Sequence, residues 1–244
     1  MKNLLRLEFR RLSRSKCLYI SFGLALLMLI WLTSSAKAMA DMFDVSQYAA
    51  AATLLSVELL LSTTELSLFT TFLCVFVCIF VCEDYRQQTV KNILARGITR
   101  GQLYFAKLIS ALTATTVMFA GLLCASFFMN VRVLGSGNPV DWGMIFRHWG
   151  AQYVVTLAYL SLYFMLSVIF RKSGAAIAAG LLLPIIAGIV LGSSASDYWL
   201  GSLATELIYT DLEIARFWEC LWVPVIYIAA SLTGGYFYHK AADL

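Results

Sequence analysis

Six long apolar segments constrain the fold of this chain more than any other feature of its sequence. Each has about the length that an α-helix needs to cross roughly 30 Å of hydrocarbon. Backbone groups in lipid must bond within the chain, and the period-two alternation of a membrane β-barrel is absent, so we expect helices. The sequence therefore predicts an all-α integral membrane protein with six transmembrane helices in one domain, residues 1–244. The predicted spans are residues 17–36, 66–82, 108–129, 149–170, 174–192 and 218–238.

The overall composition agrees with a membrane protein. Of the 244 residues, 61% are hydrophobic and 13% are charged, whereas soluble domains are about 25% charged. Three of the six cysteines, Cys74, Cys78 and Cys82, repeat every four residues and therefore share one helix face. We interpret them as small buried side chains, with a metal-binding or redox stripe as the alternative.

The basic residues predict the orientation of the chain in the membrane. When the N-terminus is placed inside, the inner connections hold 14 of the 18 Lys and Arg residues, and the outer connections hold 4. Positive charge favours cytoplasmic loops, so both termini are expected in the cytoplasm. Residues 45–65 are apolar enough for a further span, but that crossing would move the basic segment 83–107 outside. We therefore interpret 45–65 as a helix partly outside the membrane.

Two further segments suit the membrane surface. Residues 1–16 combine six basic residues with an apolar stripe of Leu5, Phe9 and Leu12. This pattern predicts an interfacial helix attracted by anionic lipid, with an unstructured basic segment as the alternative. Residues 193–217 form an outer segment that is too apolar for a plain loop and too charged to span. A short helix or helix pair that dips into the outer leaflet fits that composition, and it would either pack against the outer ends of the spans or face a ligand.

The polar stretch 83–107, EDYRQQTVKNILARGITRGQLYFAK, lies between two apolar spans on the predicted cytoplasmic side. Its first half is amphipathic, which predicts a short helix over residues 84–97. Gly97 follows the last periodic position, where a C-terminal helix cap belongs. Thr99 and Gln102 have the spacing of a capping box that starts a second helix. The stretch is therefore predicted to be a helix, a sharp corner and another helix.

This stretch resembles the segment after the second span in permeases of the ABC-2 transporter family, especially the bacitracin and lantibiotic-immunity type. In that family a Glu precedes a Gly-Thr-x-Lys-Asn-x-Leu motif, which is followed by Gly or Pro, by Ser/Thr-Arg and by Lys at the next span. Gln88 stands here where the family commonly has glycine. The resemblance also covers the basic N-terminus, the six spans and the apolar outer segment. The matching positions are Glu83, Thr89, Lys91, Asn92, Gly97, Arg100 and Lys107.

The resemblance implies a type V exporter-like fold in a bacterial plasma membrane, and a coupling helix over 84–97 that docks on a separate ATP-binding subunit. The chain would bind no cofactor itself, because ATP and Mg belong to that partner. The implied partners are two ATP-binding subunits, a second or paralogous permease, membrane lipid and a hydrophobic or peptide substrate, without nucleic acid. We also expect Glu83 and Arg100 to pair near the membrane surface. The predicted docking residues are Glu83, Arg86, Thr89, Lys91, Asn92, Ile93, Leu94, Gly97 and Arg100.

The sequence gives no support for an enzyme. It has neither the glycine-rich phosphate loop of nucleotide-binding proteins nor the G-x-S-x-G turn of hydrolases. Few ionisable residues lie at membrane depth, which disfavours a proton-coupled carrier. The resemblance implies a permease that moves a hydrophobic or amphipathic substrate, of the antimicrobial or lantibiotic-like peptide class, out of or away from the cell membrane, with ATP hydrolysed by a separate subunit. A six-span scaffold or receptor without transport is the alternative.

Overall fold

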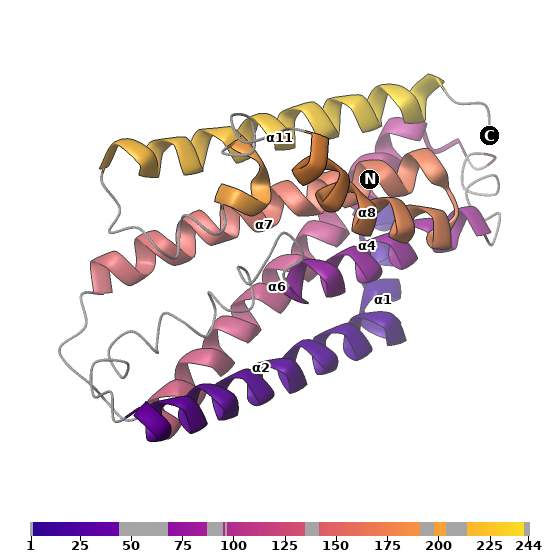
Figure 1. Ribbon diagram of the computed structural model, residues 1–244. Coiled ribbons are helices and arrows are strands. Elements are labelled where there is room, and N and C mark those ends of the chain that lie inside the picture. The colour runs from indigo at the N-terminus through magenta and orange to yellow at the C-terminus, as the bar shows by residue number, and fades with distance from the viewer. Residues whose placement is uncertain are drawn as a thin grey trace.

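The computed structural model describes residues 2–43, 68–86, 95, 97–134, 142–190, 198–203 and 214–241. Every long element in these residues is a helix, in agreement with the predicted all-α class. In Figure 1, α2 lies on one side of the bundle and α11 on the opposite side, with α4, α6 and α7 between them. The helices are α1 (Lys2–Arg14), α2 (Lys16–Phe43), α4 (Leu68–Arg86), α6 (Arg100–Leu134), α7 (Trp142–Phe170), α8 (Ser173–Val190) and α11 (Ile214–Ala241).

Each of the six predicted spans falls on one long helix, although the helices extend beyond the apolar segments. The largest extension is in α6, which begins at Arg100 rather than at residue 108. By length and composition, α6, α7 and α11 each contain a stretch that could cross a membrane within the described residues. A fourth crossing is possible if α1 and α2 form one bent span. The chain is thus a multi-pass membrane protein, and the count of six spans stays a prediction.

Helix α4 occupies the centre of the bundle. It packs against α2, α6, α7 and α8, and its middle residues Leu73, Phe76 and Val77 are completely buried. A helix that is apolar on all sides either lies among other helices or faces lipid, and the middle of α4 lies among other helices. On the far side of the bundle, the most extensive helix pair is α7 with α11.

The cysteine stripe lies on the buried surface of α4. Cys74, Cys78 and Cys82 are all 0–2% exposed, and the sulfur atoms of Cys74 and Cys78 are 4.0 Å apart. The three side chains belong to the main apolar core. This placement agrees with their interpretation as small buried side chains.

Helix α8 approaches α4 closely because Gly180 has no side chain at the contact. A Cβ atom at Gly180 would lie 2.5 Å from Cys74 Sγ and 3.3 Å from Tyr163 Cδ1. Both distances are shorter than ordinary van der Waals contacts. Small residues allow membrane helices to approach in this way.

Residues 2–14 form α1, and α1 meets α2 at an angle of 51°. Phe9 of the predicted apolar stripe is exposed, as a side chain that faces lipid would be, whereas Leu4, Glu8 and Leu12 are buried against the protein. These three residues follow i, i+4, i+8 spacing and share one face. Leu4 packs with Leu103 and Ala106 of α6. Helix α1 therefore lies against the protein along the face of Leu4, Glu8 and Leu12, and its position at the membrane surface stays a prediction.

The predicted outer segment is described only over residues 198–203 and from residue 214 onward. Trp199, Leu200 and Leu203 are buried, and the Trp199 ring meets the Tyr227 ring of α11 edge to face at 6.1 Å. These six residues therefore pack onto the bundle. Residues 45–65 lie outside the described part of the chain, so their interpretation stays a prediction.

Candidate functional site

The predicted docking stretch is described at both of its ends but not in its middle. Thr89, Lys91, Asn92, Ile93 and Leu94 lie outside the described residues, so their docking role stays a prediction. The described members are the ones that join the stretch to the membrane helices. They are Glu83, Arg86, Gly97 and Arg100.

Residues 84–86 form the last turn of α4, whereas the sequence placed the start of a separate helix at residue 84. Their side chains explain the continuation. Asp84 is fully buried, and the Tyr85 hydroxyl lies 3.2 Å from His239 Nδ1 of α11. These contacts hold the turn in the register of α4. On the other side of the same turn, Arg86 Nη2 donates to Glu83 Oε1 at 2.8 Å.

The corner at Gly97 and the restart at Thr99 are confirmed. Gly97 has a φ of +82°, a left-handed conformation that glycine adopts without steric cost. The Thr99 backbone N–H donates to Gln102 Oε1 at 3.3 Å. In return, the Gln102 backbone N–H donates to Thr99 Oγ1 at 3.4 Å. This reciprocal pair is a capping box, and it starts α6 in the turn before its apolar part.

Arg100 ties the start of α6 to the end of α11. Its Nη1 donates to the backbone carbonyl of Lys240 at 3.2 Å, where the last carbonyls of a helix lack intrahelical partners. Arg100 thus contributes to the fold of this chain by joining α6 to α11, in addition to any contact with a partner protein. The predicted pair between Glu83 and Arg100 stays a prediction.

A cluster of four charged side chains lies behind the docking stretch, and we call it the charge cluster. Its centre is the Asp84 carboxylate, which forms an ion pair with Arg11 of α1 through Oδ1 and with Lys107 of α6 through Oδ2. Glu8 Oε1 lies 3.8 Å from Arg11 Nη1. The side chains of Glu8 and Asp84 are 0% exposed, and that of Lys107 is 4% exposed. The charge cluster joins α1, α4 and α6 at the level where α4 ends.

The two carboxylates of the charge cluster have opposite pKa shifts. Burial by itself would raise the pKa of Asp84, but the Lys107 ammonium and the Arg11 guanidinium lower that pKa below its ordinary value. Burial raises the pKa of Glu8, and neither Glu8 oxygen accepts a hydrogen bond from the described residues. Asp84 is therefore the carboxyl whose charged form the cluster favours, and Glu8 is the one that takes up a proton more readily.

A second polar contact lies beside the charge cluster. The Arg171 guanidinium lies 5.9 Å from the Tyr85 ring centre and 6.0 Å from that of Tyr238. Arg171 itself has a φ of +55° at the break between α7 and α8. The end of α4 is thus held by α1 and α6 on one side, and by α11 and the α7–α8 break on the other.

Two residues in the sequence indicated the charge cluster, although hydrophobic periodicity alone does not identify it. Glu8 is the only acid among the first 16 residues, and it shares a helix face with Leu4 and Leu12. Lys107 borders an apolar segment, where a buried ammonium needs an acidic partner. The local pattern could not identify Asp84 as that partner, because Glu83 beside it is equally acidic.

A family model described as ABC-2 family transporter protein matches residues 4–195, which is most of the chain. The chain belongs to the ABC-2 transporter family. It is therefore a membrane permease of an ABC transporter, a class of protein that associates with an ABC ATP-binding subunit. A comparison with curated proteins gave no match.

The matched range of this ABC-2 permease contains the whole charge cluster, the Gly97 corner and the capping box. Helix α11 lies beyond it, although α11 supplies His239 and the Lys240 carbonyl to the same end of the bundle. The bacitracin and lantibiotic-immunity resemblance is a finer assignment than the family match, and it stays a hypothesis.

Proposed function

We propose that this ABC-2 permease moves a hydrophobic or amphipathic substrate, of the antimicrobial peptide class, out of or away from a bacterial plasma membrane. In this proposal six spans form a type V exporter-like fold with both termini in the cytoplasm. Two copies of a separate subunit hydrolyse ATP with Mg, and a second permease copy or a paralogue completes the pathway. Residues 83–107 dock on the ATP-binding subunit.

One observation carries the proposal: the first turn of the docking stretch is the last turn of the central helix of the bundle. Asp84 fixes that turn to α1 and α6 through buried charge pairs. Breaking a buried pair leaves an uncompensated charge, which costs about 3–5 kcal/mol. A movement of residues 87–97 by the ATP-binding subunit would therefore be transmitted to α4, and through the charge pairs to α1 and α6.

The packing of α4 would also transmit this movement to the other helices inside the membrane. Helix α4 packs against α7 and α8 as well as against α2 and α6, so a shift of α4 changes several helix contacts together. Packed helices have discrete arrangements rather than continuous ones. ATP-dependent movement at the docking stretch would thus alternate the bundle between two packings.

The substrate assignment is supported by the apolar side chains that the bundle leaves exposed. A second permease would bring such surfaces together along a shared pathway, and an amphipathic peptide would match apolar walls with few charges. The lantibiotic-type resemblance of residues 83–107 supports the same class. Exposed examples include Trp31 of α2, Val117 and Phe128 of α6, and Trp218 and Trp222 of α11.

The experiment reverses the charge of the docking stretch. Lys91→Glu combined with Arg96→Glu is compared with Lys172→Glu combined with Lys240→Glu, two exposed lysines outside the stretch. Each double variant changes the net charge equally. We expect only the first to lose co-purification of the ATP-binding subunit and its stimulated ATP hydrolysis, by about tenfold or more. Normal transport and association in the first variant would refute the docking role.

A further inference from the structure

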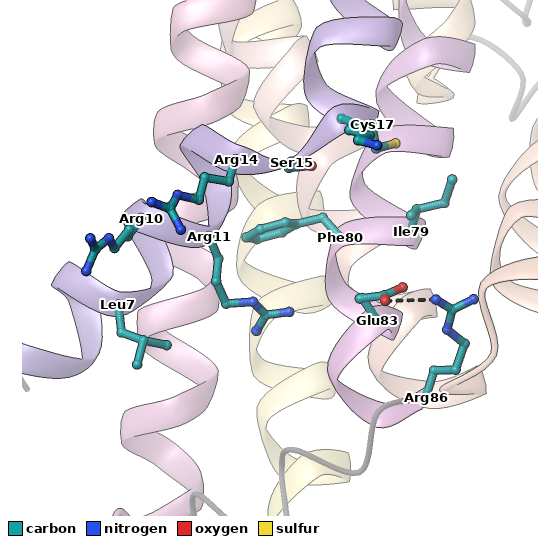
Figure 2. A pocket seen from close by; sticks show the side chains of 11 residues that line it. Leu7, Arg10, Arg11, Arg14, Ser15, Cys17, Ile79, Phe80, Glu83 and Arg86 are labelled. Atoms are coloured by element: carbon teal, nitrogen blue, oxygen red, sulfur yellow. Dashed lines mark hydrogen bonds and ion pairs between the residues drawn. The ribbon is translucent and has the colours of Figure 1, made fainter.

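A basic pocket lies beside the charge cluster, at the bend between α1 and α2. It has a volume of about 650 Å³ and lies between α1, the start of α2 and the end of α4. Figure 2 shows α1 and α4 facing each other across it, with the Phe80 ring between them. Its basic lining consists of Arg10, Arg11, Arg14, Lys16 and Arg86.

Two of these five cations already have acidic partners. Arg11 binds Asp84, and Arg86 binds Glu83, the single acid of the lining. Arg10, Arg14 and Lys16 have no carboxylate partner within the part of the chain that the structure describes. The pocket thus presents three exposed cations without carboxylate partners, an arrangement that attracts an anion.

Apart from Ser15 and Glu83, the remaining lining is apolar, which distinguishes the pocket from a site for a soluble anion. Leu7, Cys17, Ile79 and Phe80 form this part. Cys17 and Ile79 belong to the long apolar helices α2 and α4, and Leu7 belongs to the surface helix α1. Beyond the bend, Ile20 of α2 is 60% exposed and continues the apolar surface. The pocket therefore combines basic side chains with an apolar surface.

We propose that the pocket binds the headgroup phosphate of an anionic phospholipid, with its acyl chains along α2 and α4. Arg10, Arg14 and Lys16 neutralise the phosphate, while Ile79 and Phe80 meet the glycerol and the first methylenes. Basic pockets between membrane helices on the cytoplasmic side suit anionic lipid headgroups. The proposal depends on the membrane orientation and not on the transported substrate, so it goes beyond the proposed function.

The test measures binding of dioctanoyl phosphatidylglycerol to the full-length chain in neutral detergent by native mass spectrometry. Dioctanoyl phosphatidylcholine tests the need for net negative charge, and inorganic phosphate tests the need for acyl chains. We expect phosphatidylglycerol to bind at least about tenfold more tightly than either, and to weaken as salt screens the exposed cations. Phosphate binding as tight as that of phosphatidylglycerol would overturn the lipid assignment.

The variant removes the three unpaired cations as Arg10→Gln, Arg14→Gln and Lys16→Gln. Its matched control is Arg6→Gln, Lys172→Gln and Lys240→Gln, three exposed cations outside the pocket lining. Each neutralised cation near a lipid surface weakens binding about fivefold, so the pocket variant should lose at least tenfold and the control much less. Equal losses in both would mean general charge attraction and would overturn the site.

Two further measurements keep the outcome decisive. The charge-conserving variant Arg10→Lys, Arg14→Lys and Lys16→Arg should retain phosphatidylglycerol binding. If the triple Gln variant does not purify as a single species, the three single Gln variants replace it, each expected to weaken binding two- to fivefold, roughly. Unchanged lipid binding with lost association of the ATP-binding subunit would assign this surface to the protein partner and overturn the proposal.

Discussion

Adjacent carboxylates at the end of α4 show how differently two similar residues can behave. Asp84 is 0% exposed and bound by Arg11 and Lys107, whereas Glu83 is 28% exposed and pairs with the mostly exposed Arg86. When one partner of a buried ion pair is removed, water cannot solvate the buried charge that remains. Surface pairs are screened and contribute little. The two positions therefore form a matched comparison.

Asp84→Ala should destabilise the protein severely, while Glu83→Ala should not. The first substitution leaves two cations without their carboxylate and should cost about 3–5 kcal/mol. The second removes a surface pair and should cost about 0–1 kcal/mol. Thermal unfolding in detergent, followed by tryptophan fluorescence, measures both. Similar midpoints for the two variants would show that the charge cluster does not hold the helix ends.

Glu8→Gln should change the pH dependence of stability. Burial raises the pKa of Glu8 above its ordinary value of 4.5, so the folded state favours the protonated carboxyl. Its contribution is fully present below pH 4.5 and is lost as the pH rises through the raised pKa. Glu8→Gln keeps a neutral side chain at every pH.

Unfolding midpoints of both proteins from pH 4 to pH 8 measure this difference. The midpoint of the variant should rise relative to wild type as the pH increases, and the two should converge at the acid end. Asp84, with its lowered pKa, stays charged in both proteins over most of this range. A constant difference between the two curves would contradict the assignment of Glu8 as the carboxyl that takes up a proton.

At the scale of elements, the contact between α4 and α8 depends on one missing side chain. Gly180→Ala places a Cβ atom 2.5 Å from Cys74 Sγ, and overpacking of this kind costs about 1–3 kcal/mol. Adding Cys74→Ala removes the opposing sulfur, so the double variant should recover part of the loss. Gly174→Ala, with no atom within 4 Å, is the control and should keep the wild-type midpoint. An unfolding midpoint for Gly180→Ala equal to that of the control would contradict the close approach.

The elements also show how far the sequence could predict this structure. Apolar length identified the six long helices, and the glycine and capping signals identified the corner at Gly97 and the start at Thr99, because these are local effects. Hydrophobic spacing could not identify the protein-facing side of α1, because contact with α6 places the charged Glu8 on that side between Leu4 and Leu12. The partner of Lys107 was missed for the same reason, since pairing across helices leaves no local pattern.

At the scale of the whole molecule, the cytoplasmic ends of the helices form one linked layer in the proposed orientation. The charge cluster joins α1, α4 and α6, and Arg100 joins α6 to α11. Tyr85 connects α4 to α11 through His239. Arg86 and Gly97, at the two ends of the undescribed part of the docking stretch, both adjoin this layer, so a partner bound to the stretch would act on four helices together.

Site-specific photo-crosslinking tests this central claim most directly. A benzoyl-phenylalanine residue at Ile93 is compared with one at Phe128, which is 69% exposed near the other end of α6. After illumination of membranes that contain the permease and its ATP-binding subunit, the account predicts a crosslink to that subunit from position 93 and none from position 128. The absence of a crosslink at position 93, or equal crosslinks at both positions, would contradict it.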